Sequence, residues 1–106
     1  PYLISELIDF DNTIGKVLDF AEKDGNTLVV VTSDHETGGF TLRSSQKEGD
    51  NGKMYSDYTK VGTSFSTGGH SATLIPVFAF GPGSEEFIGV YENNDIFHKI
   101  LKDTGW

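Results

Sequence analysis

Hydrophobic residues near the start of the chain recur at three- and four-residue steps from Leu3 to Ala21. This spacing places them on one face of an α-helix, with the polar residues between them on the opposite face. Asp24-Gly25-Asn26 follows, and glycine is common just past the last turn of a helix. We therefore predict an amphipathic helix over this segment. Its inward face would consist of Leu3, Leu7, Phe10, Ile14, Val17, Leu18 and Ala21.

Two later apolar runs have the length and composition of strands. Residues 27–32 form a continuous β-branched run, which indicates a strand covered on both faces, as in a parallel α/β sheet. Residues 75–80 form a second strand that Gly81-Pro82-Gly83 would end. Parallel neighbours normally need a helical crossover, and no helical pattern lies between the two runs. We therefore predict that the second strand runs antiparallel to the first.

The rest of the chain predicts a long loop and a final helix. Residues 41–69 are polar and glycine-rich, which is typical of a surface excursion, and Asp50-Asn51-Gly52 predicts a turn rather than a calcium loop. Asn93 or Asn94 can cap a last helix that Gly105 would end. The residues expected to point inward from that helix are Ile96, Phe97, Ile100 and Leu101.

Composition limits the chain to one small domain of 106 residues, in which aromatic side chains would supply much of the core. The formal net charge of −8 argues against nucleic acid or anionic lipid as a partner. No apolar run approaches the roughly 20 residues of a membrane span. Cysteine is absent, so a metal would be held by His, Asp or Glu. The chain opens on Pro1 directly into a helical pattern, and we expect it to be a piece of a longer protein.

Candidate chemistry begins where the first strand ends. Asp34 and His35 stand there as a hard carboxylate beside an imidazole, a donor set that suits Zn²⁺. Both can reach one ion only if the chain turns, and Gly38-Gly39 favours a turn. The alternative is a turn-capping Asp34 next to a surface imidazole. Glu36 could be a ligand, a carboxylate that orients an imidazole, or a solvated charge.

A second candidate is His70, which follows the flexible Gly68-Gly69 pair. Taken alone, such a histidine is more often a polar loop residue than a ligand. The predicted antiparallel pairing, however, would bring His70 beside Asp34 and His35 and create a shared site. His98 lies on the last predicted helix without a second ligand at helical spacing, and we interpret it as structural or exposed.

Three stretches of sequence resemble the C-terminal part of bacterial alkaline phosphatases: residues 25–39, ending in Asp-His-Glu-Thr-Gly-Gly; residues 68–71; and residues 76–83. The resemblance covers most of the chain and is weakest from Arg43 to Gly62. It implies an α/β fold of the order helix, strand, long loop, strand, helix. These elements would form part of a central sheet flanked by helices. Residues 1–106 would then be the C-terminal portion of a catalytic domain, with residues 43–62 a variable surface loop.

The resemblance also implies a phosphoric monoester hydrolase that acts through a phosphoserine intermediate, with two Zn²⁺ ions and one Mg²⁺ ion. Asp34 and His35 match ligands of one zinc, and His70 matches a ligand of the other. The nucleophilic serine, the phosphate-binding arginine and the remaining ligands are expected upstream of Pro1. We therefore predict no catalytic nucleophile in this chain and no turnover by the chain alone. The serines that lack the nucleophile context are Ser5, Ser33, Ser64, Ser66 and Ser71.

Other functions stay open at this point. A non-catalytic metal-binding or interaction module fits the small size and the acidic balance, and a phosphomutase or sulfatase of the same superfamily keeps the Asp-His pair. As partners, the resemblance implies a phosphate monoester and the rest of the catalytic domain, and it allows a homodimer. It also implies a periplasmic or extracellular location.

Overall fold

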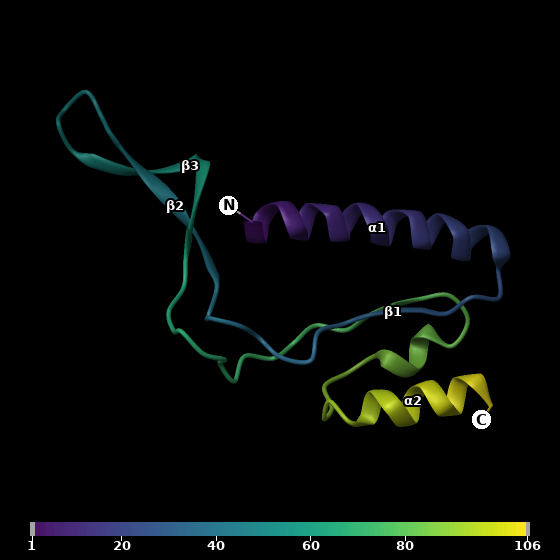
Figure 1. Ribbon diagram of the computed structural model, residues 1–106. Helices are drawn as coiled ribbons and strands as arrows, with labels where there is room; N and C mark the ends of the chain where they lie inside the picture. The colour runs from purple at the N-terminus through teal and green to yellow at the C-terminus, as the bar shows by residue number, and fades with distance from the viewer. Residues whose placement is uncertain (1, 106) are drawn as a thin grey trace. The chain divides into compact units, whose positions relative to one another are not determined.

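The computed structural model describes residues 2–105, which divide into two compact units. We call residues 2–32 with 76–105 the helical unit, and residues 33–75 the hairpin unit. Among the described residues, no helix has the length and apolar character needed to cross a membrane. The elements in chain order are α1 (Tyr2–Asp24), β1 (Val29–Val31), β2 (Thr41–Glu48), β3 (Met54–Ser64), β4 (Phe78–Phe80), η1 (Ser84–Phe87) and α2 (Asp95–Thr104) (Figure 1).

The first helix, α1, is confirmed, and it ends where the glycine signal predicts. Gly25 adopts φ 69°, and its N–H donates to the carbonyl of Ala21 over 2.9 Å. The predicted inward face is covered only in part, and Ile14 and Leu18 are half-buried. Ala21 is buried, whereas Leu7 is 61% exposed. The predicted face is therefore correct in direction, but β1 is too short to cover its first turns.

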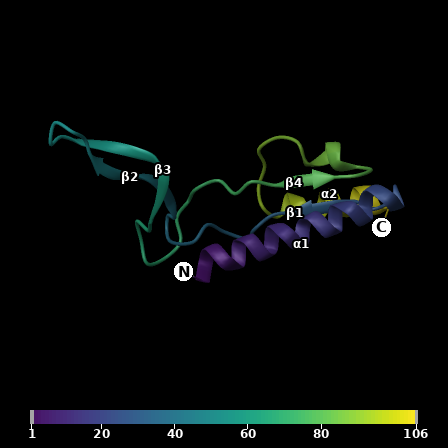
Figure 2. The ribbon, with the colours of Figure 1, turned by 90° about the horizontal axis from the view of Figure 1, so that it is seen from above.

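The predicted antiparallel pairing of the two strands is confirmed. Val29, Val30 and Val31 of β1 pair with Phe80, Ala79 and Phe78 of β4 in that register, and Figure 2 shows the two strands side by side. Both strands are shorter than predicted, because the residues that flank them limit their length.

Hydrogen bonds and proline limit the two strands. The Asp24 carboxylate accepts the hydroxyl of Thr27 over 2.7 Å, which holds the chain in a turn before β1 begins. Pro76 has no N–H to donate to a ladder, so β4 begins after it. Thr32 still reaches across, since its hydroxyl donates to the Pro76 carbonyl over 3.4 Å.

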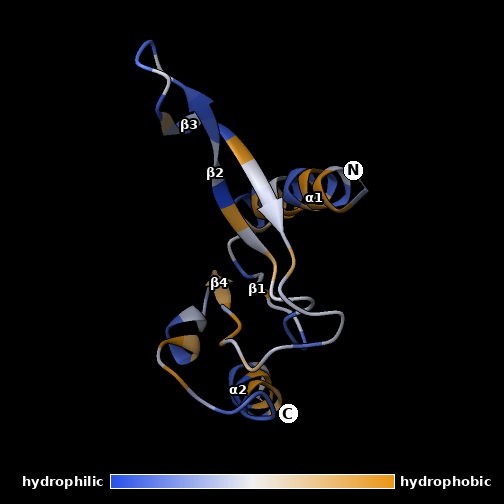
Figure 3. Ribbon diagram, turned by 90° about the vertical axis from the view of Figure 1, so that its left-hand side faces the viewer, coloured by the Kyte–Doolittle hydropathy of each residue, from blue (hydrophilic) through white to orange (hydrophobic). Residues whose placement is uncertain are grey.

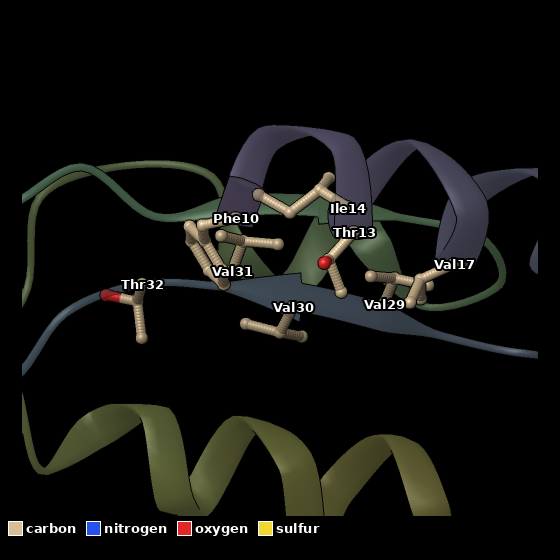
Figure 4. A pocket seen from close by; sticks show the side chains of 8 residues that line it. All are labelled: Phe10, Thr13, Ile14, Val17, Val29, Val30, Val31 and Thr32. Carbon is tan, nitrogen blue, oxygen red and sulfur yellow. The ribbon is translucent and has the colours of Figure 1, made fainter. Parts of the chain in front are cut away.

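Strand β1 lies between α1 on one side and α2 on the other (Figure 1). Its valines alternate, as strand geometry requires: Val29 and Val31 face α1, and Val30 points toward α2 (Figure 4). The continuous run of β-branched residues therefore has helices on both faces, as predicted for a covered strand. An open, mostly apolar pocket lies between α1 and β1, lined by Phe10, Thr13, Ile14, Val17, Val29, Val30, Val31 and Thr32.

The last helix, α2, begins after Asn94 and ends at Gly105, which adopts φ 70° and donates its N–H to the Leu101 carbonyl. Ile96 and Leu101 are half-buried, as predicted. The inward placement of Phe97 and Ile100 is wrong: they are 61% and 40% exposed. His98 is exposed and meets the ring of Phe97 edge-on, with ring centroids 5.3 Å apart.

An ion pair links η1 to α2. The Lys102 Nζ lies 2.6 Å from Glu86 Oε2, and the Lys99 ammonium donates to the Glu86 carbonyl. The hydrogen bond from Lys102 is the largest cause that lowers the pKa of Glu86 from its usual 4.5, while burial opposes the shift. The short helix η1 follows Gly81-Pro82-Gly83, the residues that end the strand β4, and the sequence pattern did not predict it.

We expect Glu86→Gln to lower the midpoint of urea unfolding at pH 7. The substitution should leave this midpoint unchanged at a pH at which Glu86 is protonated. A carboxyl group whose pKa is lower in the folded state stabilises it above the unfolded pKa, here near 4.5. That contribution disappears as the pH falls through the folded pKa. Urea midpoints at about pH 7 and pH 3 measure the effect. Glu85→Gln, on the exposed neighbour, is the control, and an unchanged midpoint for Glu86→Gln at pH 7 would contradict the prediction.

Residues 43–62, for which the sequence predicts a surface loop, are mostly exposed but not irregular, because β2 and β3 form an antiparallel hairpin there. The hairpin begins with the pair Thr41–Ser64 and ends with Glu48–Met54. Its strands are mostly hydrophilic along their length (Figure 3) and mostly exposed, so they show no regular alternation of apolar and polar residues. The turn at Asp50-Asn51-Gly52 is confirmed, since the Gly52 N–H donates to the Gly49 carbonyl over 2.9 Å.

The register of the hairpin shifts between Ser44 and Ser45. Asp57 is buried beside this shift and accepts the N–H and the hydroxyl of Thr59 over 3.0 and 2.6 Å. The Thr59 hydroxyl is the largest cause that lowers the pKa of Asp57. Ser45 donates its hydroxyl to the Lys60 carbonyl over 2.8 Å. Side-chain bonds thus satisfy backbone groups that the ladder leaves unpaired.

Few apolar side chains are fully buried. In the part of the chain that the structure describes, the buried hydrophobic residues are Ala21 and Phe87. The expectation of a largely aromatic core is wrong for this chain, since Tyr58, Phe78 and Phe20 are each more than 60% exposed. Neither unit has enough covering elements to enclose its apolar faces.

Candidate metal centre

Two glycine turns of the hairpin unit hold the candidate site together. Gly38 and Gly39 have φ angles of 79° and 57°, which make the chain turn after His35 as predicted. The Gly38 N–H donates to the Gly69 carbonyl over 2.8 Å, and the Gly38 carbonyl accepts the N–H of Ser66 over 2.9 Å. The loop after β1 and the loop before residue 75 are therefore joined backbone to backbone.

These bonds bring the two predicted histidines together. The ring centroids of His35 and His70 lie 3.7 Å apart, with the rings tilted by 43°. The Nδ1 atoms of His35 and His70 lie 3.2 and 3.1 Å from one acceptor, the Glu36 carbonyl oxygen. A carbonyl oxygen only accepts, so each contact is a hydrogen bond in the tautomer that carries the imidazole proton on Nδ1, the tautomer in which Nε2 can bind a metal ion. The Thr37 hydroxyl lies a further 3.3 Å from His35 Nδ1.

Asp34 completes a donor pair with His35. Its Oδ2 lies 3.4 Å from His35 Nε2, the ring nitrogen that the Glu36 carbonyl leaves free. Two ligand atoms bound at about 2.1 Å to one tetrahedral zinc are separated by about 3.4 Å. Asp34 Oδ1 accepts the N–H of His35 over 3.1 Å, which helps to hold the carboxylate in place. The pair therefore fits a divalent ion in both chemistry and spacing.

The candidate ligands are open to solvent. The side chain of Asp34 is 85% exposed, and that of His35 is 45% exposed. Within residues 2–105, no group of three or more His, Asp or Glu side chains is arranged to hold a metal ion. Zinc usually takes four ligands, so Asp34 and His35 would supply about half of one site. His98 belongs to the helical unit, whereas Asp34, His35 and His70 belong to the hairpin unit.

The Glu36 carboxylate holds the same two loops from the side. Its Oε1 accepts the N–H of Phe40 over 3.2 Å, and its Oε2 accepts the N–H of Ser71 over 3.0 Å. The Ser71 side chain is the largest cause that lowers the pKa of Glu36, and the backbone N–H groups of Phe40, Ser71 and Gly39 lower it further against the effect of burial. Ring contact between Phe40 and Phe65, with centroids 5.2 Å apart, braces the same region.

Sequence reasoning left the role of Glu36 open and did not single out Ser71 for the site. The contact between them spans 35 residues, and no local sequence pattern predicts it. The one usable signal is that Glu36 stands between a candidate ligand and a glycine turn, where a carboxylate can reach backbone N–H groups. For the candidate ligands, the sequence supplied the identities and the structure supplies their mutual distances.

Comparison with known proteins gives one consistent result. The profile of the alkaline phosphatase family matches residues 2–52 and 44–105. The alkaline phosphatase from the Antarctic bacterium TAB5 has a structure that is 71% identical, with a TM-score of 0.87, and the match covers 99% of this chain and 30% of that chain. A TAB5 variant with Mg bound in its M3 site is 72% identical, with a TM-score of 0.88 and the same coverage.

A more distant relative is alkaline phosphatase 3 of Bacillus subtilis, which is 26% identical over 160 residues. That match covers 93% of this chain and 35% of the relative. The chain thus spans about a third of the length of each of these three proteins. On the family profile and on similarity to the TAB5 structures along nearly all of its length, this chain belongs to the alkaline phosphatase family.

Proposed function

We propose that this chain is the C-terminal part of a metal-dependent phosphatase that hydrolyses phosphate monoesters, and that it supplies ligands to two zinc ions. Asp34 and His35 hold one ion, and His70 holds the second. The observation that carries the proposal is the 3.4 Å spacing of Asp34 Oδ2 and His35 Nε2, with the His70 ring against His35. Family membership and the geometry of this donor pair support the same function.

The two metal ions and the residues that would hold them have separate chemical roles in this proposal. Two bound divalent ions would neutralise charge on the attacking and leaving oxygens and lower the pKa of a bound water. Asp34 contributes a formal negative charge, and the two histidines present unprotonated Nε2 atoms to the ions. The serine nucleophile that becomes phosphorylated, the phosphate-binding arginine and the remaining ligands lie in the longer protein. A Mg²⁺ ion is part of the proposal, supported by the TAB5 structure with Mg bound.

The rest of the catalytic domain is the principal partner in this proposal. Large apolar side chains of the helical unit are exposed, including Leu7 at 61% and Phe78 at 64%. Residues of this kind are normally buried, and exposed apolar patches mark surfaces that contact other protein. The chain covers 30% of the similar solved structures, so the remainder is long enough to cover these faces. A homodimer and a periplasmic or extracellular location are proposed from family resemblance alone.

Activity of the full-length protein tests the proposal. We expect it to hydrolyse p-nitrophenyl phosphate, to prefer this ester to p-nitrophenyl sulfate, and to lose activity in EDTA until zinc and magnesium are restored. Preference for the sulfate ester would indicate the sulfatase alternative. The isolated 106-residue chain is expected to show no turnover, because the proposed serine nucleophile belongs to the rest of the longer protein. Zinc-dependent, saturable turnover by the purified chain would refute that expectation.

The module alternative requires a closed site of its own. A non-catalytic metal-binding module would hold zinc tightly with about four ligands. Calorimetric titration of the isolated chain with zinc chloride distinguishes the two functions. Weak binding that disappears in His70→Ala fits the contribution of partial sites, whereas tight binding by the chain alone favours the module.

A further inference from the structure

Glu36 contacts both loops that carry the candidate ligands. Its carboxylate oxygens are engaged separately, Oε1 by the Phe40 N–H at 3.2 Å and Oε2 by the Ser71 N–H at 3.0 Å. Ser71 directly follows His70, and Glu36 directly follows His35. One side chain thus connects the two loops next to each histidine.

The backbone of Glu36 meets the rings of those histidines. Its carbonyl oxygen lies 3.2 Å from His35 Nδ1 and 3.1 Å from His70 Nδ1. The contact to His35 is local, because the two residues are neighbours in sequence. The contact to His70 spans 34 residues and exists only while the two loops stay together.

We propose that Glu36 is a positioning residue whose carboxylate holds the His70 loop on the His35 loop, so that a single carbonyl orients both imidazoles with Nε2 available for metal. This inference rests on the proposed function, since it takes His35 and His70 as ligands. Metal ligation by Glu36 itself is disfavoured, because both of its oxygens already accept backbone N–H groups. Partners of this kind set the tautomer and orientation of ligating histidines.

Glutamine is the discriminating replacement. It has the size of glutamate but offers one acceptor oxygen and one NH₂ donor, so it can satisfy only one of the two N–H groups. We expect Glu36→Gln to raise the Kd of the full-length protein for Zn²⁺ by about 10- to 100-fold. Competition between the metal-free protein and a chelator, with zinc chloride as the probe, measures this change. Glu48→Gln, at an exposed position of β2, is the matched control.

Histidine nitrogen shifts separate positioning from general loss of structure. In the metal-free wild type, ¹⁵N NMR should show mainly the Nδ1–H tautomer for His70, because the Glu36 carbonyl accepts from Nδ1. In Glu36→Gln we expect the His70 signals to move toward a tautomer mixture, while those of His35, whose contact is local, stay near the wild type. A uniform effect on both histidines would contradict this inference.

The outcomes separate this inference from the proposed function. If the wild type binds no zinc, or if His35→Ala binds it as well as the wild type, the proposed function fails. If His35→Ala weakens binding but Glu36→Gln does not, only the role of Glu36 is refuted. Should Glu36→Gln fail to fold, Glu36→Asp decides: its side chain is one carbon shorter and cannot span both N–H groups, so wild-type zinc affinity would overturn the inference.

Discussion

Replacing His35 by alanine is expected to lower the kcat/KM of the full-length protein for p-nitrophenyl phosphate by more than about 100-fold. The substitution removes the Nε2 that lies 3.4 Å from Asp34 Oδ2 and leaves one carboxylate where a donor pair stood. Loss of an outer partner of a metal ligand already costs about 10- to 100-fold in affinity or activity, and loss of the ligand itself should cost more. Steady-state kinetics and zinc content after dialysis are the measurements.

His98→Ala provides the matched control for the His35 variant. His98 is exposed on α2, belongs to the helical unit, and contacts the ring of Phe97. We expect this variant to keep wild-type kinetics and zinc content. A His35→Ala protein that retained both would show that the Asp34–His35 pair is only a surface feature of the turn.

Gly81→Ala is expected to destabilise the protein by about 3 kcal/mol, the sum of backbone strain and overpacking. Gly81 adopts φ +104°, a conformation that L residues rarely adopt, and an added Cβ would lie 2.2 Å from the Thr27 carbonyl oxygen. That oxygen belongs to backbone just before β1, so it cannot move aside as a flexible side chain could. Urea midpoints of the full-length protein measure the effect.

Gly89→Ala separates the two causes. Gly89 has a similar φ of +113°, but no atom lies within 4 Å of an added Cβ. Its variant should show the strain without the clash and therefore lose less stability than Gly81→Ala. Equal losses in the two variants would mean that contact with Thr27 contributes nothing.

Much of the helical unit was predictable because its signals are local. Helix ends follow from glycines that can adopt positive φ, as Gly25 and Gly105 do. The antiparallel pairing followed from the absence of a helical crossover, a constraint that acts through chain length rather than through distant contacts. The exposure of Phe97 on α2 was not predicted. It depends on which elements lie next to the helix, and hydrophobic periodicity carries no information about the neighbours of a helix.

The hairpin was not predictable from its hydrophobic pattern. A strand covered on one face alternates apolar and polar residues, but β2 and β3 are largely exposed. Their pairing depends on backbone hydrogen bonds and on side-chain bonds such as Ser45 to the Lys60 carbonyl. The turn at residues 49–52 was visible because glycine and asparagine mark turns locally.

The sequence by itself indicated the candidate chemistry of this protein: which residues are of a type that can ligate a metal, that a β-branched strand precedes Asp34, and that the chain resembles the alkaline phosphatases. The tertiary structure decided the distances. It placed His70 against His35, turned both Nδ1 atoms to one carbonyl, and gave Glu36 partners in two loops. The physical reason is range: residue type, turns and helix ends are local properties, whereas a contact across 35 residues exists only in the folded chain.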